Sequence, residues 1–505
     1  MLQKIHCTEL YLAVGIMFYS GVVLFSAVLV GSSGSELKLP SWFQFGAGTS
    51  AFQIEGGWNA SDKSESVWDR QLHLFPATLD GNADVACDSY HLWRRDIEMA
   101  EELGLDMYRF SISWSRLLPT GFSNYISEDG KRYYSDLIDG LLEKGIEPVV
   151  TIHHFDLPQR IQDLGGWANP LIADWFSSYA NVVFSLFGNR VKYWLTINEP
   201  LILCDSGYTN QTVPYLDDKD IGRFLCNKNV LIAHAKAYRI YEKEYKPIYN
   251  GKVSIVNLFV WLQPATPEDK DITDLTIQYW EGRYGHAIYS KQGGWPKELE
   301  NFLLEKGRSE GYPSPRLPPF TDEEVALVKG SADFYAFNHY STRLVRKAKP
   351  GETIGSWPIL GSQELGIVLE RDPSWEVGDT VWFSVYPEGL RNQLNYLKET
   401  YGDLEFLITE NGFFSTDPSL DDTRTVDYTW KYLEQVALAI QDGVNVTGYI
   451  HWSLMDNFDK GYSAKFGLYS VDFNDPNRTR TPRASARYYS KVTRTHCPYP
   501  EDLEQ

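Results

Sequence analysis

The chain has 505 residues, of which 43% are hydrophobic, so it contains enough apolar material for a large buried core. Aromatic residues make up 14%, including 16 Trp and 32 Tyr, and this richness suits both a large core and surfaces that stack on flat apolar faces such as sugar rings. The formal net charge of −20 argues against nucleic acid and anionic membrane surfaces as partners, because a polyanion repels phosphate groups.

The first apolar segment is an uncharged stretch at 10–31, which follows Lys4 and His6 and precedes the small residues 32–35. This order is typical of a secretory signal peptide, and the length of the stretch would also suit a membrane-spanning anchor. We favour cleavage, and we expect 1–35 to be a signal peptide or N-terminal anchor and 36–505 to be a single domain. The expected protein is therefore secreted, and it contacts a membrane only if the N-terminal segment stays attached.

The cysteines and glycosylation triplets agree with passage through the secretory pathway. Five cysteines are too few and too scattered for a disulfide framework or a zinc site. Cys204 and Cys226 flank a polar loop, and we predict that they form a disulfide. Asn-X-Ser/Thr triplets indicate a glycoprotein, although such short triplets also arise by chance. The four triplets begin at Asn59, Asn210, Asn445 and Asn477.

From about residue 40 the sequence alternates short apolar strands with amphipathic helices. Several of the strands are nearly continuous apolar runs, as expected for parallel strands that are covered on both faces. The predicted strands are 43–52, 107–113, 148–154, 193–199, 253–259, 334–340, 404–410 and 448–454.

Helical periodicity fills the intervals between these strands. The predicted helices are 93–104, 133–145, 172–186, 230–245, 388–400 and 425–441. Eight strands that alternate with helices predict an α/β fold of one domain, the closed (β/α)8 TIM barrel. A doubly wound open sheet is the alternative, but no glycine-rich dinucleotide turn follows an early strand. Long loops are expected near 307–320 and at 341–380, the second over the mouth of the barrel.

Two carboxylates end strands on opposite sides of this barrel. Glu199 ends the fourth strand in "LTINEP", and Glu410 ends the seventh in "LITENG". Barrel enzymes place their chemistry at this carboxyl rim. A single strand-end glutamate would more often pair with an arginine or cap a helix, but two of them in asparagine-bearing contexts point to catalysis. Pro200 favours an extended backbone at Glu199.

Two facing carboxyls can break a glycosidic bond. A protonated carboxyl supplies the proton to the leaving oxygen, while an ionised one attacks the anomeric carbon. In retaining enzymes the two groups lie roughly 5–5.5 Å apart, and the ionised group raises the pKa of its neighbour. That charge disappears when the covalent intermediate forms, so the same acid can then act as a base.

Eight motifs spread over residues 40–495 occur together in one order. The motifs are "FGAGTSAFQIEGGW", "ACDSYHLWRRDI", "YRFSISWSRLLPTG", "TIHHFDLP", "TINEP", "FNHYS", "ITENG" and "HWSLMDNF". With these motifs the chain resembles glycoside hydrolase family 1, the β-glucosidase family, and especially its animal and insect members, including myrosinase-like and lactase-like proteins.

The resemblance implies two catalytic glutamates, a supporting arginine and a tyrosine that belongs to the substrate-binding set. Glu199 matches the acid/base of the family, and Glu410 matches its nucleophile. Arg109 and Tyr340 match residues that lie beside the nucleophile and keep it ionised and oriented.

The resemblance also implies a set of sugar-binding residues. Asn198 would hold the sugar 2-hydroxyl, and Gln53 and His154 would hold the 3- and 4-hydroxyls. Trp452 would form the platform under the sugar ring. His153 precedes His154 on the same strand, so its side chain should point the other way and be structural.

The segment "WSLMDNFDKGYS", 452–463, departs from the family pattern. Asp459 stands where the family has a Glu that holds the 4- and 6-hydroxyls, and Lys460 stands where it has a Trp; alternatively, that Glu-Trp pair is deleted. We assign Asp459 to substrate binding, although it is one methylene shorter. Phe155 replaces a usual Trp, and the unusual segment 208–224 is expected to reshape the entrance for the aglycone.

The expected function is a retaining β-glycosidase that hydrolyses β-glucosides or related small O-glycosides through a covalent glycosyl-enzyme intermediate. Thioglucosides stay open as S-glycoside substrates, because insect enzymes of that type retain the acid residue that plant myrosinases lose. The alternative is a catalytically weak or silent protein on the same barrel that binds a carbohydrate or a partner, which the altered Asp459–Lys460 segment favours. The chain has no HExxH motif and no cysteine pair at zinc spacing, and the expected chemistry needs no metal or cofactor.

Overall fold

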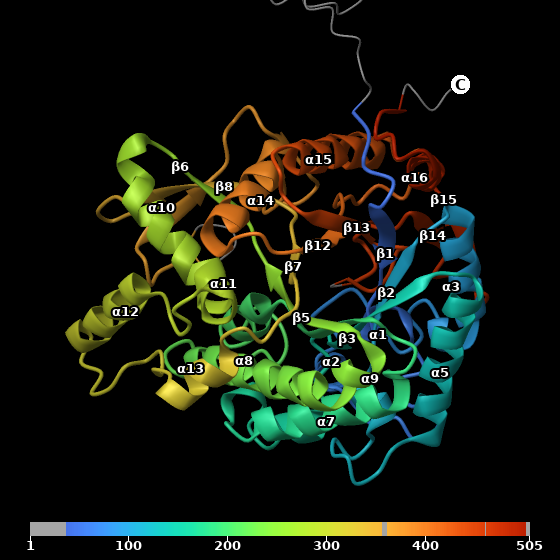
Figure 1. Ribbon diagram of the computed structural model, residues 1–505, viewed down its shortest axis with the longest axis horizontal. Helices are drawn as coiled ribbons and strands as arrows, with labels where there is room; N and C mark the ends of the chain where they lie inside the picture. The colour runs from blue at the N-terminus through green and yellow to red at the C-terminus, as the bar shows by residue number, and fades with distance from the viewer. Residues whose placement is uncertain (1–36, 356–360, 460, 501–505) are drawn as a thin grey trace, which may run out of the picture.

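Eight parallel strands close into a barrel in the computed structural model, which describes residues 37–355, 361–459 and 461–500 (Figure 1). Each predicted barrel strand is confirmed, with ends that differ by a few residues. In spatial order the strands are β1 (Gln44–Gly48), β2 (Met107–Ser111), β3 (Glu147–His153), β4 (Tyr193–Asn198), β5 (Lys252–Leu258), β7 (Tyr335–Asn338), β12 (Phe406–Asn411) and β13 (Val446–Trp452).

The interior of the barrel is filled at one end by a separate cluster of buried apolar side chains. Every strand but β1 supplies or adjoins a member, because alternate residues of each strand point inward. The cluster consists of Met107, Val149, Leu195, Val256, Phe334, Ala336, Leu407 and Ile450. A substrate can therefore reach the barrel axis only from the opposite end, where the carboxyl ends of the strands lie.

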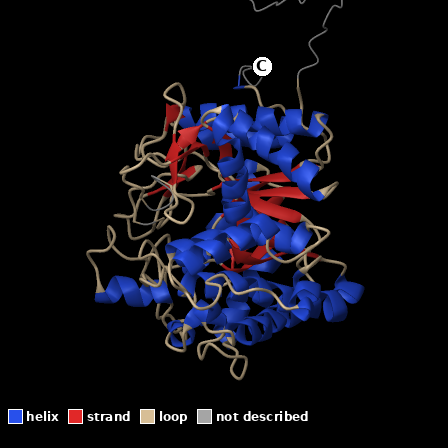
Figure 2. Ribbon diagram, turned by 90° about the vertical axis from the view of Figure 1, so that its left-hand side faces the viewer, coloured by secondary structure: helices blue, strands red, loops and turns tan. Residues whose placement is uncertain are grey.

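Helices surround the strands, as the side view in Figure 2 shows. The six predicted helices are all present. They are α3 (Ser89–Leu103), α5 (Glu128–Glu143), α7 (Ile172–Phe187), α8 (Gly222–Ile240), α14 (Glu388–Tyr401) and α15 (Thr423–Gln441). The others are α1 (Ala51–Ile54), α2 (Val67–Leu74), α4 (Trp114–Leu117), α6 (Gln159–Gln162), α9 (Lys246–Tyr249), α10 (Lys270–Ile277), α11 (Arg283–Tyr289), α12 (Lys297–Ser309), α13 (Asp322–Val328) and α16 (Ala484–Thr495).

The prediction of a loop at 341–380 is wrong in part. β8 (Thr342–Lys347) pairs with β9 (Ile367–Glu370) and with β6 (Trp261–Pro264), and the three form a small sheet that packs against α10. The alternation of buried and more exposed residues along β8 is the signal that the neighbouring glycines and prolines obscured. The remaining strands are β10 (Glu376–Val377), β11 (Ser384–Val385), β14 (Tyr469–Val471) and β15 (Arg480–Pro482).

The other long loop is shorter than expected, because α12 continues to Ser309. Among the described residues, none of the helices is both long and apolar enough to cross a membrane. The signal peptide or anchor predicted at 1–35 lies outside the described residues.

Candidate active site

Glu199 and Glu410 lie at the carboxyl ends of β4 and β12, at the open end of the barrel. Both side chains are buried, with residue exposures of 8% and 4%. Glu199 follows the last residue of its strand, and its backbone φ is +44°. The prediction that Pro200 keeps the backbone extended at Glu199 is therefore wrong. Glu199 instead starts the next helical turn, whose Leu203 amide donates to the Glu199 carbonyl at 3.0 Å.

The Glu410 carboxyl accepts from two donors, one on each oxygen. Arg109 Nη1 donates to Oε1 at 2.5 Å, and the Tyr340 hydroxyl donates to Oε2 at 2.7 Å. Arg109 is fully buried, and its Nη2 donates to Asn198 Oδ1 at 2.7 Å. One guanidinium therefore joins β12 to the end of β4, and it fixes Glu410 relative to the residue before Glu199.

Asn338, the last residue of β7, joins the Glu199 carboxyl to the strand that carries Glu410. Its Nδ2 donates to Glu199 Oε1 at 2.7 Å, and its Oδ1 accepts from the Thr409 hydroxyl at 2.7 Å. In the strand register Asn338 stands opposite Glu410. Sequence reasoning missed this residue, although it lies in the "FNHYS" motif that supplied Tyr340. Its place at the end of a barrel strand is the signal that could have found it.

The two carboxyl groups have opposite electrostatic surroundings. Burial raises the pKa of Glu199 above its usual 4.5, and the negative charge of Glu410 raises it further. The Asn338 bond and the Arg109 charge act in the opposite direction. Burial and the charge on Glu410 also raise the pKa of Tyr340, so this phenol stays a donor. The surroundings of Glu199 thus favour its protonated form.

His154 lies next to Asn198 and stacks on Trp452. Their rings are stacked, with centroids 5.7 Å apart and planes 9° apart. His154 Nε2 lies 3.4 Å from Asn198 Nδ2, and its Nδ1 has no hydrogen-bond partner among the described residues. Burial and the Arg109 charge lower the pKa of His154 well below 6.5, so its ring is neutral.

His153 points away from these residues, as the strand alternation predicts. Its ring packs against Trp167 at 5.2 Å and Trp114 at 6.5 Å, both buried in the main core. Burial lowers the pKa of His153 to about 3. It is therefore a neutral core residue.

A small cavity of about 60 Å³ brings together Gln53, His154 and Asp459. Gln53 lies on α1, and the first strand ends at Gly48 rather than at the predicted residue 52. The Phe458 amide donates to the Gln53 carbonyl at 3.1 Å, which joins the altered segment to α1. Lys460 lies outside the described residues. Aromatic side chains form most of the other walls: Phe52, Trp68, Phe155 and Phe458.

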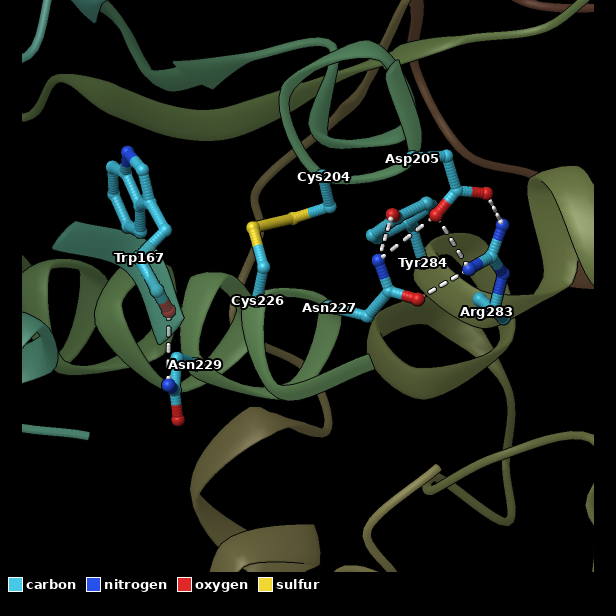
Figure 3. The surroundings of a disulfide bond; sticks show 8 residues. All are labelled: Trp167, Cys204, Asp205, Cys226, Asn227, Asn229, Arg283 and Tyr284. Carbon is cyan, nitrogen blue, oxygen red and sulfur yellow. Dashed lines mark hydrogen bonds and ion pairs between the residues drawn. A yellow bond between two sulfur atoms is a disulfide. The ribbon is translucent and has the colours of Figure 1, made fainter. Parts of the chain in front are cut away.

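The segment after Glu199 forms one wall of this cavity and is tied down covalently. The predicted disulfide is confirmed: Cys204, in the helical turn Ile202–Ser206, is bonded to Cys226 on α8 (Figure 3). Beside it Asp205 pairs with the buried Arg283 at 2.5 Å. Within the unusual segment 208–224, Thr212 lines the cavity together with Ile202.

Comparisons with known proteins agree with this geometry. The family model described as glycosyl hydrolase family 1 matches residues 35–497. Myrosinase 1 of Brevicoryne brassicae is 44% identical over 473 residues, which are 92% of this chain and 100% of the relative. A cytosolic beta-glucosidase of Homo sapiens is 40% identical over 470 residues, 91% of this chain and 99% of the relative. The solved structure of an aphid myrosinase superposes with a TM-score of 0.86 at 42% identity, and it covers 91% of this chain and 99% of its own.

Proposed function

Because the chain belongs to glycosyl hydrolase family 1, it is a retaining β-glycosidase, and we propose that Glu199 is its acid/base and Glu410 its nucleophile. The observation that carries this assignment is the contrast between the two carboxyls. Glu410 accepts from a guanidinium and a phenol, whereas Glu199 accepts from the neutral amide of Asn338. The first environment favours a carboxylate and the second permits a carboxylic acid.

In the first step a Glu410 oxygen forms a bond to the anomeric carbon while the bond from that carbon to the leaving oxygen breaks. Glu199 gives its proton to the leaving oxygen, so the aglycone departs as a neutral alcohol. Glu410 is now a neutral ester. Arg109 and Tyr340 hold the attacking oxygens in place and limit the motion needed to reach the sugar.

In the second step water attacks the same carbon and Glu199 removes its proton. The loss of charge on Glu410 removes one of the causes that raise the Glu199 pKa, so Glu199 is a stronger acid in the intermediate and can act as the base in its ionised form. Cleavage of the ester returns Glu410 to its ionised state, and the sugar leaves with its configuration retained.

The sugar is proposed to bind with its 2-hydroxyl on Asn198 and with its 3- and 4-hydroxyls on His154 and Gln53. Trp452 supplies the apolar platform. Asp459 shares a cavity with Gln53 and His154, which supports its assignment to the outer hydroxyls despite the shorter side chain.

We propose β-glucosides and related small O-glycosides as substrates, with thioglucosides as a second accepted class. The similarity to a myrosinase and to a β-glucosidase supports both. A panel of aryl β-glucosides, β-galactosides and a thioglucoside would rank them. The silent-protein reading has no support here, because both carboxyls, Arg109 and Tyr340 are in place.

The sharpest test of the catalytic assignment is Glu199→Ala. We expect turnover of glycosides with poor leaving groups to fall about 10²–10⁴-fold, because they need the proton, and turnover of good leaving groups to fall far less. Added azide should restore turnover with the good leaving groups and yield a β-glycosyl azide. Glu410→Gln is the control, since it should be inactive on every substrate and unresponsive to azide. An equal loss for all leaving groups would remove Glu199 from the acid role.

We also propose that the protein is a secreted glycoprotein whose segment 1–35 is a signal peptide or anchor. The Cys204–Cys226 disulfide supports an oxidising compartment. Each of the four predicted glycosylation asparagines is exposed: Asn59, Asn210, Asn445 and Asn477. Expression of the full chain in insect cells tests this: we expect active protein in the medium with an N-terminus near residue 36, and retention in the cytosol would contradict it.

A further inference from the structure

A surface cleft lies beside the turn that follows Glu199. Its volume is about 540 Å³, within the range of small-ligand sites. Leu201 and Asp205 line this cleft, whereas Ile202 lines the small cavity that brings together Gln53, His154 and Asp459. The turn Ile202–Ser206 therefore lies between the cleft and that cavity, and the Cys204–Cys226 disulfide anchors it.

Several of the charged side chains that line the cleft form ion pairs. Glu364 binds Arg223 at 2.5 Å and Arg316 at 2.7 Å. Arg316 also binds Glu310 at 3.1 Å, and Asp205 is neutralised by Arg283. A charged ligand would have to break these pairs, so the cleft suits a neutral ligand that uses the free edges of the paired groups as donors and acceptors.

Aromatic rings and unused donors complete the walls. Tyr279 and Tyr312 both line the cleft, and the Arg316 guanidinium lies 5.0 Å from the Tyr312 ring. The Tyr279 hydroxyl and the Nε atoms of Arg223 and Arg316 have no hydrogen-bond partner within the described parts of the chain. Arg223 is only 8% exposed, and buried donors of this kind are normally satisfied by water or a ligand. Rings beside hydrogen-bonding groups are the chemistry that holds a saccharide.

Asn210 stands at the rim of this cleft. Thr209 and Gln211, its neighbours on both sides, line the cleft, and Asn210 itself is exposed. With Gln211 and Thr212 it forms an N-glycosylation triplet. Its backbone φ of +58° belongs to the left-handed region, which Asn tolerates better than most residues. A saccharide attached to Asn210 would therefore start at the edge of a cleft whose lining suits a saccharide.

We propose that Asn210 carries an N-linked glycan whose first sugars dock in this cleft. The inference rests on the proposed passage through the secretory pathway. There the Asn210 amide nitrogen bonds to the anomeric carbon of an N-acetylhexosamine, the bond from that carbon to the pyrophosphate of a lipid-linked oligosaccharide donor breaks, and the amide loses one proton. The core sugars are neutral and rich in hydroxyl and amide groups, as the cleft requires.

Tethering explains how a polar surface cleft could hold a sugar firmly. An attached ligand binds at a high effective concentration, so contacts that would be weak for a free saccharide suffice. The docked sugars would pack against the turn Ile202–Ser206 and so support the backbone next to Glu199.

The test is site-resolved release of glycans from the native protein, secreted from insect cells, by an amidase that cleaves N-glycans. Peptide mass spectrometry reports the rate at each site. We expect release at Asn210 to be about tenfold slower than at the other three sites, as for a docked state favoured by roughly 10:1. Asn59, Asn445 and Asn477 are internal controls, because none of them lies between residues that line this cleft. After denaturation all sites should be released at similar rates.

Two cleft variants and one remote variant show whether docking causes the protection. Tyr312→Ala should raise the rate at Asn210 to within about twofold of the controls, and Tyr279→Phe should raise it in part. Tyr125→Ala, an exposed tyrosine outside the cleft, should leave it unchanged. An unmodified Asn210, or release at Asn210 as fast as at the controls, overturns the proposal.

A removal variant and an activity assay keep this test separate from the test of catalysis. Asn210→Gly deletes the glycan without backbone strain at the positive φ, and we expect it to unfold at a lower temperature than the glycosylated protein. Turnover of a β-glucoside is measured on the same samples. If turnover is retained but the Asn210 glycan is released as fast as the control glycans, only the docking proposal fails. If the Asn210 glycan is released slowly but turnover is absent, only the catalytic assignment is contradicted.

Discussion

At the scale of single residues, Asn338 controls the protonation of Glu199. The hydrogen bond that the Asn338 side-chain amide donates to Glu199 stabilises the ionised form of this carboxyl. It therefore lowers the pKa of Glu199, which burial and the charge of Glu410 raise. In Asn338→Ala the pKa of Glu199 should therefore rise. Because kcat/KM requires the protonated acid, the alkaline limb of its pH profile should move to higher pH, by about one unit for a hydrogen bond of roughly 1.5 kcal/mol.

The matched control for this variant is Asn257→Ala. Asn257 is also buried at a barrel strand, but it donates to Tyr335 rather than to either carboxyl. The alkaline limb of the kcat/KM profile of Asn257→Ala should stay at the wild-type pH. A limb that does not move in Asn338→Ala would show that another group governs it.

Asp459 acts on the same pKa with the opposite sign. Its negative charge is one of the causes that raise the pKa of Glu199. In Asp459→Asn the ionised form of Glu199 should be less disfavoured, so the alkaline limb of kcat/KM should move to lower pH. KM for glucosides should also rise if this carboxylate holds outer hydroxyls. Asp459→Glu, which keeps the charge, should leave the limb in place, and a limb that moves equally in both variants would contradict the electrostatic cause.

Much of the candidate site could be predicted from the sequence, because its members lie in short motifs at strand ends. Glu199, Glu410, Arg109 and Tyr340 meet as expected. The role of Asn338 could not be read in the same way, because it depends on the register between β7 and β12. Side-chain neighbours across a barrel are set by strand register, which a linear motif does not contain.

At the scale of elements, the disulfide joins the turn after β4 to α8 across a separation of 22 residues. In the double variant Cys204→Ala/Cys226→Ala the free energy of unfolding should fall by about 3 kcal/mol, because closing a loop of this size restricts the unfolded chain. Denaturant titration measures the loss. Reducing agent should destabilise the wild type and leave the double variant unchanged, and equal sensitivity of both would contradict the assignment.

The elements themselves were predictable where hydrophobic periodicity is strong. All eight barrel strands and six helices were found in this way. The small sheet of β6, β8 and β9 was missed, because its strands are brought together only by the folded barrel and lie among turn-forming residues. The start of α8 at Gly222 was missed for a similar reason: its first turns are held by the disulfide and by Arg283, not by an apolar face.

At the scale of the whole molecule, the net charge of −20 surrounds the site with a negative field. An anionic thioglucoside should therefore bind more slowly at low salt, and its kcat/KM should increase as salt screens the repulsion. A neutral aryl β-glucoside is the control, and its kcat/KM should stay nearly constant. A fall in kcat/KM of the anionic substrate with added salt would instead indicate local cationic attraction at the mouth.

The packed apolar cluster fills one end of the barrel interior, so the active site opens to solvent at the other end. The freed aglycone leaves through the same opening by which water enters, and water attacks only after the glycosyl ester has formed. An alcohol that binds at this opening competes with water in the attack on the glycosyl ester. Concentrated small alcohols should thus be converted into new glycosides, and the enzyme should build such bonds as well as break them.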